Sequence, residues 1–301
     1  MHKLESQTYK SKLQTSSEDF KKNKDSMLGM LQEIDLLLDE AEAGGGPDHH
    51  ERLAARGKLP VRERIFNFLD PDSPFLEISG LAGYKSDYPV GGGAVAGVGV
   101  CTGIECIIFA NDPTVLAGAM HFYSVKKWMR AMAIARDCKI PFIQFVESAG
   151  GDLRPRSGQV VGGTTHFAES GRQFYEITEL SKLNIPTVTV TFGTATAGGA
   201  YQPGMSDYNI FVKDQADVAL AGPPLVQMAT GEISSREDIG GAKMHAEKSG
   251  LAEYLAEDDL DGIRIAREVM SHLNWKKEGN LPRFKIKDPL EPTLMLKEFI
   301  E

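Results

Sequence analysis

The sequence is poor in cysteine. Of its 301 residues only three are cysteines, namely Cys101, Cys106 and Cys138. Their spacing contains neither a CxxC pair nor a set of four ligands, which argues against a structural zinc site and against a disulfide framework. We therefore expect no metal in this chain and a reducing compartment, which is the cytoplasm or, in a eukaryote, the mitochondrial matrix.

Positive charge and long apolar runs are also scarce. Lysine and arginine number 33 against 42 aspartate and glutamate residues, which gives a formal net charge of -9. General affinity for nucleic acid or for an anionic membrane surface is therefore not expected. The first 24 residues are polar and lysine-rich, and nowhere do about 18 apolar residues run together as a membrane helix requires. We expect a soluble, intracellular protein in which a local pocket holds any anionic ligand.

The chain begins with helical patterns. Apolar residues recur at helical spacing over residues 19–43, which predicts an amphipathic helix. Three glycines and Pro47 end this helix, and Pro60 begins a second short one. These helices form a lead-in rather than a separate domain.

Strands and helices alternate from residue 91 onward. Alternating or continuous apolar patterns predict strands at residues 96–100, 104–110, 142–146, 187–192, 208–213 and 217–220. Helical spacing predicts helices around Val125 to Ala133, over 166–183, after Pro223 and over 260–273. The first two strands are separated by a two-residue turn and form a hairpin. The repeated order of strand, strand and helix predicts an α/β spiral rather than a doubly wound sheet.

Paired glycines stand where two buried strands end, in the segments ESAGG at 147–151 and TAGGA at 196–200. In such a fold both turns can lie on one side of the sheet. Backbone N–H groups at these turns carry partial positive charge and can hold an oxyanion without any side chain. The candidate catalytic residues are therefore Gly150, Gly151, Gly198, Gly199 and Ala200. The alternative is that each glycine pair only turns the chain.

Side chains near these turns offer little conventional catalytic machinery. Ser148 and Ser206 lack a motif-spaced His or Asp partner, which argues against a serine hydrolase. Three histidines are too scattered for a metal site and are interpreted as structural: His121, His166 and His245. Glu147 is the carboxylate beside the first turn. It is either a base, as in an enoyl-CoA hydratase-like enzyme, or a hydrogen-bonded residue that orders the loop.

Two groups of basic residues are candidates for binding the phosphates of coenzyme A. They are Arg56, Lys58, Arg62 and Arg64 in one group, and Lys126 and Lys127 beside aromatic residues in the other. The alternative for either group is a solvated, salt-bridged face.

A set of short segments carries a family resemblance. In chain order they are RGKL at 56–59, RERI at 62–65, AVAG at 94–97, AND at 110–112, AGGAY at 197–201 and LAGPPL at 220–225. Together they resemble the N-terminal domain of the carboxyltransferase β subunits of biotin-dependent acyl-CoA carboxylases that act on propionyl-, methylcrotonyl- and geranyl-CoA. The resemblance extends from about residue 51 to residue 275. The sequence at 221–225 resembles the methylcrotonyl- and geranyl-CoA enzymes more than the propionyl-CoA enzymes.

The resemblance implies a crotonase-like ββα spiral with a second, related domain after it. On this basis we interpret residues 1–50 as the helical lead-in, 51–278 as the acyl-CoA carboxyltransferase N-terminal domain, and 279–301 as a linker towards a missing C-terminal domain. In the family the C-terminal domain of a partner subunit holds carboxybiotin borne on a carrier protein. A homo-oligomer, a biotin carboxylase and a biotin carrier are therefore the implied partners.

The resemblance also implies a reaction, in which a carboxyl group moves from carboxybiotin to an acyl-CoA through a thioester enolate. The family's oxyanion contacts correspond to 198–200, with 149–151 as their partner, and Tyr201 and Gln202 border the acyl pocket. Arg56, Lys58 and Lys126 complete the expected substrate-binding residues. Glu147 departs from the aspartate typical of the family. A biotin-dependent decarboxylase of the same fold and a CoA-binding assembly module without turnover are the alternatives.

Overall fold

The computed structural model describes residues 12–152, 154 and 167–276. Its contacts divide the chain into two compact units, Met1–Leu37 with Gly279–Glu301, and Leu38–Glu278. The glycine turns and the sheet that carries them belong entirely to the second unit. In the part of the chain that the structure describes, no helix has the length and apolar character needed to cross a bilayer.

The first long helix is present as predicted. Helix α1 spans Glu18–Ala43, and Gly44 follows it with a left-handed φ of +56°. Helix α2, at Pro47–Ala54, was not predicted, because Pro47 was interpreted only as a helix terminator. A proline in the first turn has no N–H to lose there, so Pro47 begins the next helix.

Helix α3, at Val61–Phe68, confirms the short helix predicted after Pro60. The β-hairpin is also confirmed, with β2 at Ala94–Cys101 pairing antiparallel with β3 at Ile104–Asn111. Both turn residues have left-handed φ values, as a two-residue hairpin turn with the correct twist requires. A two-residue strand, β1 at Leu76–Glu77, pairs with the outer side of the hairpin.

A run of parallel strands continues the sheet from β3. The elements that follow are α4 (Phe122–Cys138), β4 (Phe142–Ser148), α5 (Phe167–Lys182), β5 (Thr187–Thr196), β6 (Tyr208–Val212), β7 (Asp217–Ala219) and β8 (Tyr254–Ala256). The sheet order is β1-β2-β3-β4-β5-β6-β8, and every pair beyond the hairpin is parallel. Parallel neighbours end at the same edge of a sheet, so the loops after β4 and β5 meet there.

Strand β5 carries two neighbours on one side. Its first half pairs with β6 through Val188 and Tyr208, and its last residues pair with β7 through Thr194 and Asp217. The sheet therefore turns away from a single plane at the end of β5. This arrangement agrees with the predicted spiral of strand, strand and helix.

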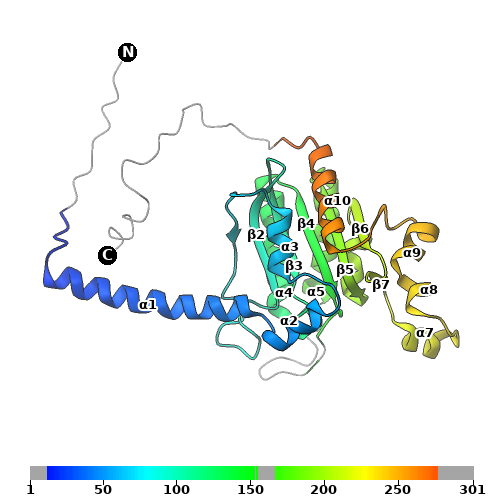
Figure 1. Ribbon diagram of the computed structural model, residues 1–301, viewed down its shortest axis with the longest axis horizontal. Helices are drawn as coiled ribbons and strands as arrows, with labels where there is room; N and C mark the ends of the chain where they lie inside the picture. Colours follow the sequence, from blue (N-terminus) through cyan, green and yellow to red (C-terminus); the bar gives the residue numbers. More distant parts are fainter. Residues whose placement is uncertain (1–11, 153, 155–166, 277–301) are drawn as a thin grey trace, which may run out of the picture. The chain divides into compact units, whose positions relative to one another are not determined.

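Alternating side chains of the strands build a core on each face of the sheet. Ile108 of β3 packs with α3 and with α10 (Asp259–His272), whereas Ile107 and Phe109 point to the opposite face, under α4 and α5. Figure 1 shows α3 and α10 on one side of the strands. Short helices close the second unit, at Tyr201–Gly204 (α6), Pro223–Thr230 (α7), Arg236–Gly240 (α8) and Ala242–Met244 (α9).

Candidate active site

The two glycine turns touch each other at the carboxyl edge of β4 and β5. An added Cβ on Gly150 would lie 3.0 Å from the carbonyl oxygen of Thr196, and one on Gly199 would lie 3.4 Å from Ser148. Gly150 also has a φ of +93°, which a side chain would strain. The structure therefore brings together the two segments that the sequence places 45 or more positions apart.

A neighbouring loop fixes the first turn. The N–H of Ala149 donates to the carbonyl of Ala117 at 3.1 Å, and the N–H of Met120 donates to the carbonyl of Gly150 at 2.7 Å. Gly118 lies so close to β4 that an added Cβ would be 1.9 Å from the carbonyl oxygen of Glu147. This close approach holds the first turn against the start of α4.

The glycines of the two turns differ in how far they are exposed. Gly151 is exposed, and among the described residues its N–H donates no hydrogen bond. Gly198 is half-buried, near the start of a 3-10 turn over Ala197–Ala200, while Gly150, Gly199 and Ala200 are buried. Such an arrangement can hold a carbonyl oxygen that acquires negative charge, since glycine leaves room for close approach.

The serine and histidine side chains serve structure. Ser148 is 1% exposed, and its hydroxyl accepts a hydrogen bond from the Gly150 N–H at 3.2 Å. The ring of His121 stacks on Tyr88 with ring centroids 4.2 Å apart, and His245 contacts Ser249 and the carbonyl of Val218. His166 lies outside the described residues. No described serine near the turns is paired with a histidine that could activate it.

Tyr201 and Gln202 follow the second turn directly. The Tyr201 ring is 39% exposed and lies 4.4 Å from the ring of Phe174, so it borders the surface beside the turn. Gln202 points inward and is fully buried, and neither polar atom of its amide has a hydrogen-bond partner among the described residues. A buried amide of this kind normally requires a partner, such as an ordered water.

The candidate phosphate-binding residues differ in their surroundings. Arg56 is exposed after α2, and Lys126 is exposed near the start of α4, with its ammonium 4.2 Å from the centroid of the Phe122 ring. Lys127 is 2% exposed, and its ammonium donates to the carbonyls of Gly91 at 3.1 Å and Ala94 at 2.7 Å. Burial lowers the pKa of Lys127 to about 8, although Glu77 opposes the shift.

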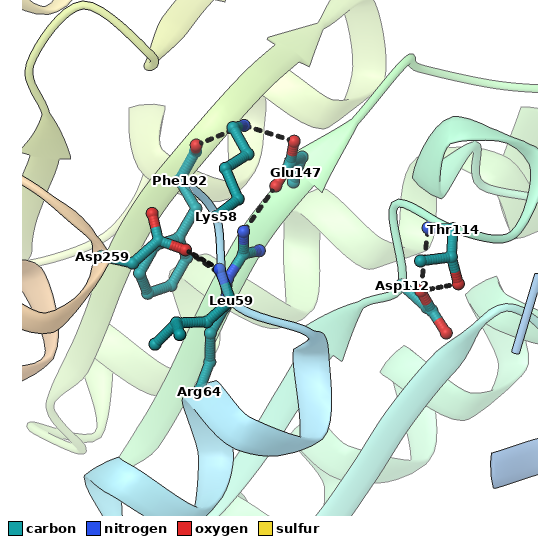
Figure 2. Close-up of polar contacts among 8 residues, drawn as sticks. All are labelled: Lys58, Leu59, Arg64, Asp112, Thr114, Glu147, Phe192 and Asp259. Carbon is teal, nitrogen blue, oxygen red and sulfur yellow. Dashed lines mark hydrogen bonds and ion pairs between the residues drawn. The ribbon is translucent and has the colours of Figure 1, made fainter. Parts of the chain in front are cut away.

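Lys58 and Glu147 belong to one buried ionic network, which Figure 2 shows. The Lys58 ammonium contacts Glu147 Oε1 at 2.5 Å and the carbonyl of Phe192 at 2.8 Å. Arg64 contacts the other oxygen of Glu147 at 2.9 Å and Asp259 at 2.9 Å. Both oxygens of Glu147 are thus occupied by cations, which fits the loop-ordering role left open for it and not a base.

Sequence reasoning missed this network. Its partners are as much as 195 positions apart, and no helical or strand periodicity relates them. The signal lay in the basic residues of 56–65, which were candidates for phosphate ligands, with a solvated, salt-bridged face as the alternative. Only 1% of the Arg64 side chain is exposed, so this residue needs buried carboxylates as partners. The one hint in the sequence was its place beside Val61, Ile65 and Phe68 in a short helix.

Two of the three cysteines, Cys101 and Cys106, are buried. Burial raises the pKa of the Cys101 thiol to about 12 and raises that of Cys106 well above its ordinary value. Within the described ranges, no three His, Cys, Asp or Glu side chains gather as a metal site requires.

Comparison with known proteins identifies the family. The carboxyl transferase domain model matches residues 52–300. The chain belongs to the carboxyl transferase domain family. Within this family it is 49% identical over 85% of its length to a probable biotin-dependent acyl-coenzyme A carboxylase beta2 subunit of Mycobacterium tuberculosis, covering 47% of that protein. It is 40% identical over 92% of its length to the methylcrotonoyl-CoA carboxylase beta chain of Dictyostelium discoideum, also covering 47%.

Solved structures of the carboxyl transferase domain family confirm the fold class. The geranyl-CoA carboxylase beta subunit of P. aeruginosa matches with a TM-score of 0.83 and 39% identity, over 94% of this chain and 52% of that one. The transcarboxylase 12S structure with hydrolysed methylmalonyl-coenzyme A bound matches with a TM-score of 0.72 and 28% identity, over 81% of this chain and 47% of that one. The chain thus spans about half the length of the relatives that it matches.

Proposed function

We propose that this chain is the acyl-CoA-binding half of a carboxyltransferase that moves a carboxyl group from carboxybiotin to an acyl-CoA. The observation that carries the proposal is the contact between the two glycine turns in a member of the carboxyl transferase domain family, with a Gly151 N–H that donates no hydrogen bond within the part of the chain that the structure describes. This geometry supports the stabilisation of a thioester enolate by backbone groups.

In this mechanism the turns bind the thioester carbonyl. As the proton on the neighbouring carbon leaves, negative charge moves onto the carbonyl oxygen, and the N–H groups of Gly151 and of 198–200 stabilise it. The Gly150 N–H orders the first turn through its hydrogen bond to Ser148. Biotin, when bound, supplies the carboxyl group and the atom that accepts the proton. Glu147 is engaged with two cations and does not act as the base. Gly151 itself is exposed, as a residue that contacts a ligand must be.

Exposed basic residues are the best candidates for the CoA phosphates. Arg56 and Lys126 are both exposed in the second unit, and a protein of net charge -9 needs such local cations to hold an anionic ligand. Tyr201 and Gln202 are proposed to border the acyl group, since they continue directly from the second turn.

The proposed partners follow from the relatives. Proteins named as biotin-dependent carboxylase β subunits suggest a biotin-bearing carrier, a biotin carboxylase and a homo-oligomer, and the transcarboxylase 12S neighbour is described as a hexamer. Biotin would thus be carried on a separate protein. We propose residues 51–278 as the carboxyltransferase N-terminal domain and 279–301 as a linker towards the second half.

The test is a transfer assay on the chain joined to a second half like that of its relatives. With carboxybiotin carrier supplied, methylcrotonyl-, geranyl- and propionyl-CoA are offered in turn, and carboxylated acyl-CoA is measured. We expect product with at least one of them. Net loss of the carboxyl group from an acyl-CoA would support the decarboxylase instead, and acyl-CoA binding without turnover would support the assembly module.

A further inference from the structure

The regular pairing of β4 and β5 is interrupted just before the glycine turns. Val146 pairs with Thr191, whereas Ser148 pairs with Ala195, so Glu147 alone faces three residues of β5. Irregularities of this kind release backbone groups from the ladder and re-aim the chain that follows. Some other group must therefore fix the two strands at this point.

Lys58 connects the two strands at the interruption. Its ammonium donates at 2.5 Å to Glu147 Oε1 on β4 and at 2.8 Å to the carbonyl of Phe192 on β5. Only 9% of the Lys58 side chain is exposed. One buried cation thus satisfies a carbonyl within the irregular stretch and holds both strands at a common position.

The Glu147 carboxylate is held from several sides. Arg64 contacts its second oxygen at 2.9 Å, and Arg64 is in turn anchored by Asp259 at the start of α10. Gly193 lies against it, since an added Cβ there would be 2.6 Å from Oε1. With two cations and two anions the network is neutral, as burial demands.

We propose that Lys58 and Glu147 are positioning residues that set the spacing of the two oxyanion turns. Glu147 precedes Gly150 by three residues, and Phe192 precedes the turn at Ala197–Ala200 by five. A shift between the strands at this point moves one set of N–H donors relative to the other. The inference rests on the proposed function, because it assigns Lys58 and Glu147 to the geometry of enolate binding instead of to contact with the substrate.

The first test is amide hydrogen exchange in the 301-residue chain without any ligand. In Glu147→Gln we expect the amides of 148–151 and 197–200 to exchange about tenfold faster or more, because local opening becomes easier there. The matched control is Glu77→Gln. Glu77 on β1 accepts two hydrogen bonds from Arg62, at 2.7 and 3.2 Å, and the substitution breaks this ion pair. Arg62 belongs to α3, as Arg64 does, but its ion pair does not involve the strands that lead into the turns.

Two variants of Lys58 disturb the network less and can be used if Glu147→Gln does not fold. Lys58→Met removes the ammonium but leaves Glu147 paired with Arg64, and Lys58→Arg restores a cation. We expect faster exchange at both turns in Lys58→Met and recovery towards wild type in Lys58→Arg. A purely structural role predicts instead that exchange rises evenly through the sheet.

The second test is the transfer assay on the same variants. Misplaced donors should lower kcat by about 10²-fold while KM changes little, since acyl-CoA binding groups are untouched. The inference would be overturned if the amides of the two turns exchanged no faster in Glu147→Gln than in Glu77→Gln. A folded Glu147→Gln enzyme with the kcat of wild type would overturn it as well. If the wild-type enzyme transfers no carboxyl group, the proposed function fails, and hydrogen exchange alone decides the positioning role.

Discussion

Single backbone N–H groups carry the chemistry proposed for this chain, so substitutions that remove one donor are the most direct probes. Gly199→Pro removes an N–H within the second turn and fixes φ. We expect carboxyl transfer to fall by about 10²–10³, the usual effect of losing one oxyanion donor. Transfer is measured in the assay proposed above, with folding checked by circular dichroism.

Ser148→Ala is the comparison for Gly199→Pro. The Ser148 hydroxyl only accepts from the Gly150 N–H at 3.2 Å, so its loss should weaken the first turn without removing a donor. We expect less than about a tenfold loss of transfer, consistent with a single modest hydrogen bond. A folded Gly199→Pro enzyme with near-normal transfer, or Ser148→Ala as inactive as the proline variant, would contradict the backbone mechanism.

Lys127 gives a prediction about pH. Burial lowers its pKa from 10.5 to about 8 in the folded protein. Below pH 8 the lysine is charged in both states, and the folded state carries the cost of burying that charge. Between pH 8 and 10.5 the folded state binds fewer protons than the unfolded state, so stability rises with pH by an amount of about 3 kcal/mol in total.

The measurement is urea unfolding of wild type and Lys127→Met at several pH values from 7 to 10. Other groups titrate in this range in both proteins, so the difference between the two free energies isolates Lys127. We expect the free energy of unfolding of wild type to increase relative to that of Lys127→Met as the pH rises above 8. Parallel pH profiles would show that Lys127 titrates normally.

At the scale of elements, the loop before α4 supports the first turn through a close approach. Gly118 has a φ of +68°, and an added Cβ would lie 1.9 Å from the Glu147 carbonyl oxygen. Gly118→Ala should therefore reduce the free energy of unfolding by about 3 kcal/mol or more, from backbone strain and displacement of β4. Gly103 is the control, because its φ is +76° but nothing lies within 4 Å.

Gly103→Ala should cost only about 1 kcal/mol, the penalty of a left-handed alanine alone. Both values come from urea unfolding at pH 7. Equal losses in the two variants would mean that the contact with β4 adds nothing to the strain.

The length of an element decides whether the sequence could predict it. The hairpin, β4 and α10 followed from periodicity, because each repeats its pattern over enough residues to be recognised. Strand β8, at Tyr254–Ala256, is three residues long and exists through its pairing with β6. Short helices α8 and α9 likewise carry too few residues to show a period.

The candidate site divides in the same way. The glycine turns were predictable because parallel strands deliver their ends to one edge. The phosphate-binding role expected for Lys58 is untested, and the positioning role proposed above replaces it. The pairing of Lys58 with Glu147 and Phe192 depends on how β4 and β5 lose register, which no local pattern encodes.

At the scale of the molecule, the chain covers about half of each relative, and Gly151 in the first turn is exposed. An acyl-CoA held by one wall of a site makes fewer contacts than an enclosed one, so binding to this chain alone should be weak. We expect a dissociation constant of roughly 0.1–1 mM, or about 4–5.5 kcal/mol of binding free energy, by isothermal titration.

The exposed cations should contribute to that binding. Arg56→Gln and Lys126→Gln should each weaken it by about 1.5- to fivefold, as expected for an exposed charge pair, while Glu77→Gln should leave it unchanged. Adding the second half as a separate chain should tighten binding, because a second wall then encloses the thioester and excludes water from the donors. A folded chain that binds no acyl-CoA at millimolar concentration would contradict the acyl-CoA assignment, whatever the activity of the longer protein.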